Sequence, residues 1–336
     1  LVRKTWMRVW WYLGEAVPLF LVGTLLLFVL DKARALDSIA AGATFAAEQP
    51  WKRHVVWEGG RTNTAVGGDF TGDGLPDVLV GSCDYANGTA GQGAVFVFKG
   101  ASGGLDPAPV FKLEGDQANL HMGTTVAGVG DVNKDGVVDF AIGTPAYSSG
   151  SGRVMIFYGS KGAISTTPAA SFEPGQAGSR FGASVAGAGD VNKDGYADVI
   201  VGAPGWDDKL VDEGMAAIYV GGAGVLATDP TWKVFGNQRG ASLGAAVAGL
   251  GDVDGDGLPE VAASAPKYAS PTVVDAGAIL VFPGAAGGPK TTASPAIVGA
   301  ASSFGPGAQL GSALLAAGDL NGDGHPDLAA FGGYAR

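Results

Sequence analysis

The sequence repeats one nine-residue loop five times, and no other feature limits its fold as strongly. The copies begin at Asp69, Asp131, Asp190, Asp252 and Asp319, about 60 residues apart. Each copy has an oxygen-bearing side chain at its first, third, fifth and ninth positions and a glycine at its sixth. Self-similarity at a fixed period is typical of repeat architectures, in which each period is one structural unit.

The residue types in the loop are those of a calcium site. Alternate positions of a tightly curled loop point to one centre, and the glycine permits the turn that brings in the carbonyl of the seventh position. Oxygen ligands of these kinds suit Ca²⁺, so we predict about five bound ions. We expect the first loop, with its threonine, to bind most weakly and the fourth, with four acids, most strongly. The predicted ligands are Asp69, Thr71, Asp73, Leu75, Asp77, Asp131, Asn133, Asp135, Val137, Asp139, Asp190, Asn192, Asp194, Tyr196, Asp198, Asp252, Asp254, Asp256, Leu258, Glu260, Asp319, Asn321, Asp323, His325 and Asp327.

The helix-loop-helix EF-hand is the main competing interpretation of such a loop. It requires a bidentate glutamate at the twelfth position. That position holds Val80, Ile142, Val201, Ala263 and Ala330 in the five copies. The chain instead enters an apolar, strand-like run directly after each loop. The loops therefore connect strands rather than helices.

The segments around the loops predict four short strands in each period. One apolar run precedes each loop, as at 183–189, and one follows it. A third run lies at 94–98, 153–158, 216–220 and 278–282, and a poorer fourth run at 110–113, 170–173 and 232–235. Four strands in a period of about 60 residues make a blade, and blades around an axis make an all-β propeller. Stacked solenoids usually have shorter repeats and are disfavoured.

Composition and charge agree with this fold and exclude some partners. The chain has 58 glycines, which suits dense turns, and a formal net charge of −11, which argues against nucleic acid as a partner. The predicted cages contain 16 of the 32 acidic residues, so bound cations would relieve their repulsion. The single cysteine, Cys83, excludes an internal disulfide framework and any zinc site built from several cysteines.

The N-terminal segment, residues 1–30, is expected to be a membrane anchor or a signal segment. Its apolar run at 16–30 is short for a span but lengthens if extended toward the N-terminus, and basic residues precede it. Both interpretations place the rest of the chain outside the cell or on the periplasmic face. Residues 11–32 also resemble a membrane segment of bacterial ferrous-iron permeases. Residues 31–50 are expected to be a linker.

Two further motifs carry a family resemblance. Phe-Gly occurs at 181–182. In the other repeats Met-Gly replaces it at 122–123 and Leu-Gly at 243–244 and 310–311. Gly-Ala-Pro stands at 202–204, with variants at 143–145 and 264–266. With the loops, these motifs resemble the FG-GAP repeats of integrin α subunits and related bacterial propellers over residues 51–336. The resemblance implies a seven-bladed ring with calcium loops on one rim, of which this chain shows five repeats. We therefore expect a fragment of a ring, or a ring that partner chains complete.

No catalytic set is visible in the sequence, so we expect a binding protein and not an enzyme. His54, His121 and His325 lack metal-ligand or triad spacing and are expected to be structural or solvated. The resemblance implies an adhesion or recognition module for a protein or glycan ligand. An exported hydrolase or lyase on a propeller scaffold is the alternative, because fold alone does not fix function. A propeller attached to a membrane transporter is the weaker alternative.

Overall fold

The computed structural model describes residues 64–224, 226–293, 296–299 and 307–332. The chain divides into two units, Leu1–His54 and Val55–Arg336, and the described residues all belong to the second. The expected N-terminal anchor (1–30) and linker (31–50) lie outside the described residues. Within the described ranges, no helix has both the length and the apolar character needed to cross a membrane.

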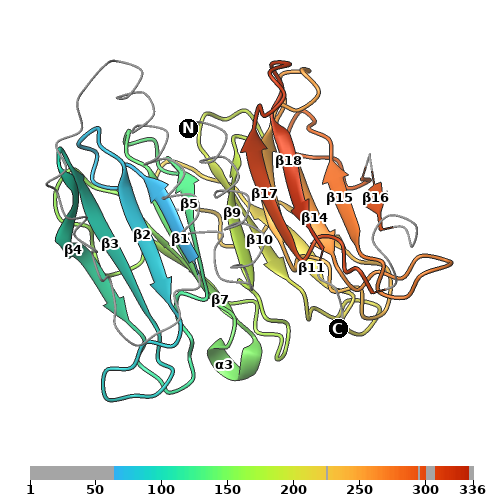
Figure 1. The fold of residues 1–336 in the computed structure, drawn as a ribbon, viewed down its shortest axis with the longest axis horizontal. Helices are drawn as coiled ribbons and strands as arrows, with labels where there is room; N and C mark the ends of the chain where they lie inside the picture. Colours follow the sequence, from blue (N-terminus) through green and yellow to red (C-terminus); the bar gives the residue numbers. More distant parts are fainter. Residues whose placement is uncertain (1–63, 225, 294–295, 300–306, 333–336) are drawn as a thin grey trace, which may run out of the picture. The chain divides into compact units, whose positions relative to one another are not determined.

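The described part of the chain is all-β, and its strands form antiparallel sheets consistent with propeller blades. In four sheets the strands follow chain order from one edge to the other, as Figure 1 shows for β1 to β4. The strands are β1 (Thr64–Gly68), β2 (Asp77–Ser82), β3 (Ala94–Ala101), β4 (Gly104–Glu114), β5 (Thr125–Gly130), β6 (Asp139–Thr144), β7 (Arg153–Phe157), β8 (Ala170–Phe172), β9 (Ser184–Gly189), β10 (Asp198–Ala203), β11 (Met215–Tyr219), β12 (Trp232–Phe235), β13 (Val247–Gly251), β14 (Glu260–Ala265), β15 (Ala278–Phe282) and β16 (Ala296–Val298).

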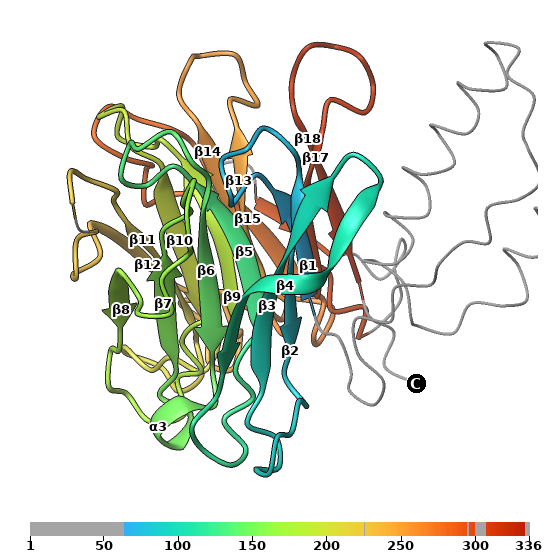
Figure 2. The same cartoon turned by 90° about the vertical axis from the view of Figure 1, so that its left-hand side faces the viewer.

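The fifth repeat contributes a pair of described strands, β17 (Ala313–Gly318) and β18 (Asp327–Phe331). They lie side by side in Figure 2. A single turn, α3 (Tyr147–Gly150), interrupts the connection between β6 and β7, and Ser148 and Ser149 inside it have left-handed backbones. The described chain is thus built from strands and their connections.

The core lies between successive sheets. The first strands of neighbouring sheets contact one another in order, β1 with β5, β5 with β9, β9 with β13 and β13 with β17. Between the first two sheets, Phe140 stacks on Phe157 with ring centroids 5.4 Å apart, and Phe111 meets Phe140 edge to face at 5.3 Å. Both faces of the second strand in each complete sheet are covered, which is why these strands are almost entirely apolar.

Glycines hold neighbouring repeats in contact at the end of the blade opposite the nine-residue loop. A Cβ atom added to Gly81, Gly143 or Gly202 would lie 2.0–2.2 Å from the carbonyl oxygen of Gly123, Gly182 or Gly244. Gly143 and Gly202 begin the Gly-Ala-Pro motif and its variant, Gly81 has the equivalent position in the first repeat, and the second set belongs to Phe-Gly and its variants. The two motifs recur together because their backbones touch, which favours glycine at both positions; the fourth repeat has the small Ser264 in place of the first glycine.

Candidate metal centre

All five loops use the same hydrogen bonds to fold their acidic side chains inward. The glycine at the sixth position donates its N–H to the Oδ2 atom of the first aspartate at 2.8–2.9 Å. The seventh residue donates to the Oδ1 atom of the fifth aspartate, also at 2.8–2.9 Å. The sixth-position glycines have φ between 86° and 90°, which side-chain-bearing residues rarely adopt. The loop sequence thus orients the first and fifth carboxylates locally.

The side chain of the third position joins them in four of the loops. Asn133, Asn192, Asp254 and Asn321 each accept the N–H of the fifth residue on Oδ1, at 2.8–3.2 Å. In the second loop, the same N–H of Asp135 also reaches Oδ1 of Asp131 at 3.0 Å. Oxygens from the first and third positions therefore converge on one side of the loop. This convergence is the arrangement that a hard cation requires.

The ninth position is anchored differently, by a residue far away in sequence. Asp77, Asp139, Asp198 and Glu260 are at most 2% exposed. One carboxylate oxygen of each accepts an N–H from the start of its own loop at 2.8–2.9 Å. The other accepts an N–H from a glycine at or just beyond the end of the third strand, at 2.8–2.9 Å. The ninth residue therefore ties the loop to its own sheet.

Those third-strand glycines are functional residues that the loop motif does not include: Gly100, Gly159, Gly221 and Gly284. An added Cβ would lie 2.2–2.5 Å from an atom of the seventh to ninth loop positions. A glycine at each third-strand run was the only signal for them in the sequence. That signal is weak in a chain so rich in glycine.

Burial makes the ninth carboxyl difficult to ionise in the second and third loops. Removal from water raises the pKa of Asp139 to about 7, although the N–H groups of Gly159 and Val132 favour the charged form. The same balance raises the pKa of Asp198 to about 6. The nearby charges of the first and fifth aspartates add to the effect in both loops. A cation at the centre would relieve this repulsion.

The first loop departs from the others at its third position. Thr71 is buried, and among the described residues its Oγ1 atom has no hydrogen-bond partner. The ammonium group of Lys99 lies 3.0 Å from Oδ2 of Asp73. The N–H of Leu75 and the Lys99 side chain hold the pKa of Asp73 below its usual value. A buried hydroxyl without a hydrogen-bond partner fits a metal ligand, while the ammonium group of Lys99 would compete with the ion.

The fourth loop brings its carboxylates closest together. One oxygen from each of Asp252, Asp254 and Glu260 lies within 4.8 Å of the others. In the fifth loop, Asp319 and Asp323 accept the same backbone hydrogen bonds as their equivalents in the other loops. The pKa of Asp319 lies below its ordinary value, and the largest cause is the hydrogen bond from the N–H of Gly324. Asp327 there is only half-buried. The donor set of the loops fits a hard divalent cation.

Neighbouring loops also contact each other directly. The carbonyl of Asp131 accepts the N–H of Ala197 at 3.0 Å, and the Lys134 ammonium lies 5.3 Å from the centre of the Tyr196 ring. A Cβ on Gly255 would lie 2.8 Å from the ring of His325, which links the fourth and fifth loops. An ion bound in one loop would therefore stabilise the edge of the next.

An acidic segment lies outside the loops. In the acidic segment 207–213, Glu213 is buried and accepts backbone N–H groups from Asp208, Lys209, Leu210 and Asn237. Burial would raise the pKa of Glu213, but these four donors outweigh it, and the pKa lies below its ordinary value. Its role is to shape the segment. Trp206 beside it packs on the core between the second and third sheets.

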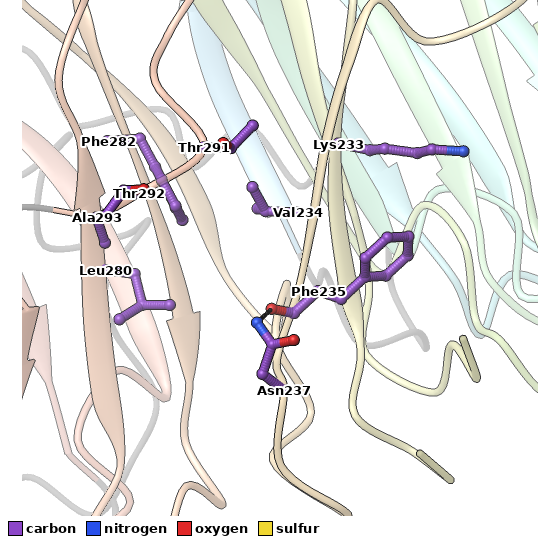
Figure 3. A pocket seen from close by; sticks show the side chains of 9 residues that line it. All are labelled: Lys233, Val234, Phe235, Asn237, Leu280, Phe282, Thr291, Thr292 and Ala293. Atoms are coloured by element: carbon purple, nitrogen blue, oxygen red, sulfur yellow. Dashed lines mark hydrogen bonds between the residues drawn. The ribbon is translucent and has the colours of Figure 1, made fainter. Parts of the chain in front are cut away.

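A hollow of about 450 Å³ lies between the outer strand of the third sheet and the fourth sheet. Val234, Leu280 and Phe282 form part of its wall, and the Asn237 side chain donates to the carbonyl of Phe235 at 3.0 Å (Figure 3). The lining is mostly apolar, with two threonines at one side. Lys233 and Asn237 also line it.

Comparison with known proteins identifies similar sequences. The family described as "FG-GAP repeat" matches residues 61–98, 122–157, 181–220, 243–282 and 310–335, more than half of the chain. "Integrin alpha-6" of Gallus gallus is 37% identical over 137 residues, 40% of this chain and 12% of its own length. "Integrin alpha pat-2" of Caenorhabditis briggsae is 33% identical over 232 residues, 62% of this chain and 18% of its own. The chain therefore spans less than a fifth of these curated relatives.

Solved structures with a similar arrangement of strands are more distant. A rhamnogalacturonan lyase of Bacillus licheniformis has a TM-score of 0.45 at 19% identity, covering 81% of this chain and 46% of the lyase. An exotype rhamnogalacturonan lyase has a TM-score of 0.44 at 17% identity, with 81% and 44% covered. Likeness at this level carries no argument about the activity of this chain.

Proposed function

Because the chain belongs to the FG-GAP repeat family, we propose that it is a calcium-binding recognition module that works outside the cell. The observation that carries the proposal is the prefolded state of its five loops. In each, backbone N–H groups hold the first and fifth carboxylates at 2.8–2.9 Å. Carboxylates held this close together repel one another in the metal-free protein, and a bound cation would remove that repulsion.

Calcium is the ion that suits these loops best. The donors are carboxylates, amides, a hydroxyl and the carbonyl of the seventh residue, and none is nitrogen or sulfur. Ca²⁺ accepts six to eight such oxygens in flexible geometry, whereas Mg²⁺ requires a near-ideal octahedron. Extracellular modules of this kind bind with dissociation constants of about 10⁻⁴ to 10⁻³ M. About five ions per chain would therefore remain bound outside the cell and act as structural elements.

The role of the ions is to stiffen the surface that a ligand meets. Each loop is tied to its own sheet through the ninth carboxylate and to the next loop through backbone bonds such as that from Ala197 to Asp131. A filled row of loops is rigid, and a rigid surface loses less entropy on binding. The integrin α relatives support a protein ligand, and a glycan is the second choice.

The location follows from the same chemistry and from the N-terminal segment. Residues 1–30 are proposed as the anchor or signal that exports residues 51–336 to the extracellular or periplasmic face, with 31–50 as the linker. Calcium is abundant enough there to fill weak sites. We propose a binding role with no catalytic step.

The test is thermal unfolding of the full chain in detergent, with millimolar calcium, with magnesium and with excess chelator. Because the ions bind the folded state and several sites add their effects, we expect a large rise in Tm with calcium, a smaller one with magnesium, and about five calcium ions per chain by elemental analysis. Equal Tm values in calcium and chelator, with no bound metal, would reduce the loops to polar turns. A single-site variant, Asp256→Asn in the fourth loop, should lower the number of bound calcium ions by about one.

A further inference from the structure

A second group of metal-binding residue types lies in the first repeat, at the end of the blade opposite its loop. Cys83 and Asp84 directly follow β2, and His121 lies shortly before β5. One donor atom from each of the three lies within 4.8 Å of the others. From this cluster we propose that the chain binds one Zn²⁺ ion through Cys83 Sγ, Asp84 Oδ1 and His121 Nδ1. The site is separate from the five calcium loops.

The spacing of the donor atoms already approaches that of a tetrahedral site. Asp84 Oδ1 lies 3.5 Å from Cys83 Sγ and 3.6 Å from His121 Nδ1. Zinc bonds of about 2.0–2.3 Å at tetrahedral angles separate neighbouring ligands by roughly 3.3–3.7 Å. Two edges of the tetrahedron are therefore present. The Asp84 and His121 side chains are 44% and 41% exposed, which leaves the fourth position open to water.

The backbone around His121 fixes where its ring lies. Its N–H donates to the carbonyl of Gly91 at 2.8 Å, and its carbonyl accepts the hydroxyl of Thr124 at 2.6 Å. Its φ of 50° places the residue in the left-handed region. Nδ1 also lies 3.3 Å from the carbonyl of Cys83. Metal binding requires the tautomer with its proton on Nε2, so the ring exchanges this weak bond for a bond to zinc.

The equivalent positions of the other repeats do not carry these donors. In place of Cys83 they have proline, in the Gly-Ala-Pro motif and its variants. In place of His121 they have other residues that share its left-handed backbone, with φ between 44° and 58°. The equivalent sets are Pro145, Ala146 and Arg180, then Pro204, Gly205 and Ser242, then Pro266, Lys267 and Gln309. The first repeat alone, among the four that the structure describes here, carries three zinc-type ligands at this junction.

The donor set selects a different metal from that of the loops. A thiolate and an imidazole nitrogen favour zinc, whereas calcium takes oxygen alone. Binding releases the thiol proton to solvent and leaves the carboxylate and the neutral imidazole otherwise unchanged. Because Cys83 follows β2 of the first sheet and His121 leads into the second sheet, the ion would join two neighbouring blades. Its effect on the protein is stabilisation of that junction.

The test uses Co²⁺ as a coloured substitute for zinc, added to the full chain with its loops saturated by calcium. Cys83 is the only cysteine, so a thiolate-to-cobalt charge-transfer band can arise from this cluster alone. We expect the band to saturate at one equivalent and to disappear when Zn²⁺ is added. Cys83→Ser should abolish it, while the rise in Tm with calcium persists.

Two further variants separate the proposed site from a lone thiolate. Asp84→Asn and His121→Gln should each weaken cobalt binding at least about tenfold. Loss of a group that only hydrogen-bonds to a metal ligand already lowers metal affinity by about that factor, and these two residues are proposed to bind the metal directly. Asp106→Asn in β4 of the same sheet is the control and should leave binding unchanged. Absence of the band, or a band insensitive to both variants, would overturn the proposal. Loss of calcium binding alone would not, because it concerns the other sites.

Discussion

The first and fourth loops share one backbone frame and differ in the charge that it surrounds. In both, the sixth-position glycine and the seventh residue donate to the first and fifth aspartates at 2.8–2.9 Å. The first loop has Thr71 at the third position and the Lys99 ammonium on Asp73. The fourth has Asp254, and three of its carboxylates converge within 4.8 Å. The same frame thus surrounds different charges, and we expect the charge to set cation affinity loop by loop.

The first loop partly neutralises itself. Lys99 supplies a positive charge where the fourth loop has none among the described ion pairs. We therefore expect the two loops to respond alike when the frame is damaged and differently when the charge is changed.

The largest effect is expected from pH in the metal-free protein, through the second and third loops. Burial raises the pKa of Asp139 to about 7 and of Asp198 to about 6, from 3.8. The folded state therefore holds these protons more tightly than the unfolded chain. Their contribution to stability is complete below about pH 4 and is lost as the pH rises to about 7. Denaturant unfolding in chelator should show a fall of about 7 kcal/mol, since the two groups together give about five tenfold changes in proton affinity, each worth about 1.4 kcal/mol.

Calcium should reverse that slope, because the ion binds the ionised carboxylates and gains affinity as the pH rises. The variant Asp139→Asn with Asp198→Asn should flatten the slope in chelator, whatever its absolute stability. A metal-free protein that grows more stable from pH 4 to pH 7 would contradict the assignment of these two carboxyls.

The next largest effect tests the shared frame. A Cβ in Gly100→Ala would lie 2.2 Å from the carbonyl of Pro76, and in Gly284→Ala 2.5 Å from Cβ of Leu258. Each change also displaces the N–H that anchors a buried ninth carboxylate. We expect a loss of about 3 kcal/mol in both loops by denaturant unfolding in calcium. Gly103→Ala has open space around its Cβ and should change stability by less than about 0.5 kcal/mol.

The hydrogen bonds of the loops were only partly predictable from the sequence. The bonds within positions one to seven span at most five residues, so the repeated motif contains them. The ninth carboxylate is anchored by a glycine 20–24 residues away. That pairing depends on how β2 and β3 and their equivalents align in the sheet. A local motif does not report sheet register, so the third-strand glycines were missed.

Most strands, by contrast, were predictable, because the pattern that indicates a strand is local in the sequence. The expected runs 232–235 and 278–282 coincide with β12 and β15, because an alternating apolar pattern in the first and a continuous apolar run in the second both indicate a buried strand. The expected run 110–113 is only the end of β4, which begins at Gly104. Pro107 and Pro109 lie in the missed part, where the pairing with β3 shifts register. Proline removes ladder donors and is read as a break, so an irregular edge strand escapes a pattern-based prediction.

The third prediction exchanges the charge between the two loops. Thr71→Asp gives the first loop the carboxylate of the fourth, and Asp254→Thr gives the fourth loop the hydroxyl of the first. We expect calcium affinity to rise about tenfold in the first loop and to fall about tenfold in the fourth, because affinity follows the number of charged ligands. Calorimetric titration measures both. Unequal or absent changes would mean that the frame, and not the charge, sets affinity.

The smallest effect is expected from Lys99→Met, which removes the ammonium group from Asp73 but keeps an apolar stem of similar length. The ammonium lies 3.0 Å from Asp73 Oδ2 and is partly exposed, so its attraction is screened by water. In calcium, the affinity of the first loop should rise roughly threefold, since the ion no longer competes with the ammonium group. In chelator the same variant should be slightly less stable than the wild type, because nothing then balances Asp73. Lys134 of the second loop forms no ion pair with its own loop among the described contacts, so Lys134→Met is the matched control. If Lys99→Met weakens calcium binding instead, Lys99 supports the first loop, and the contrast with the fourth rests on Thr71 alone.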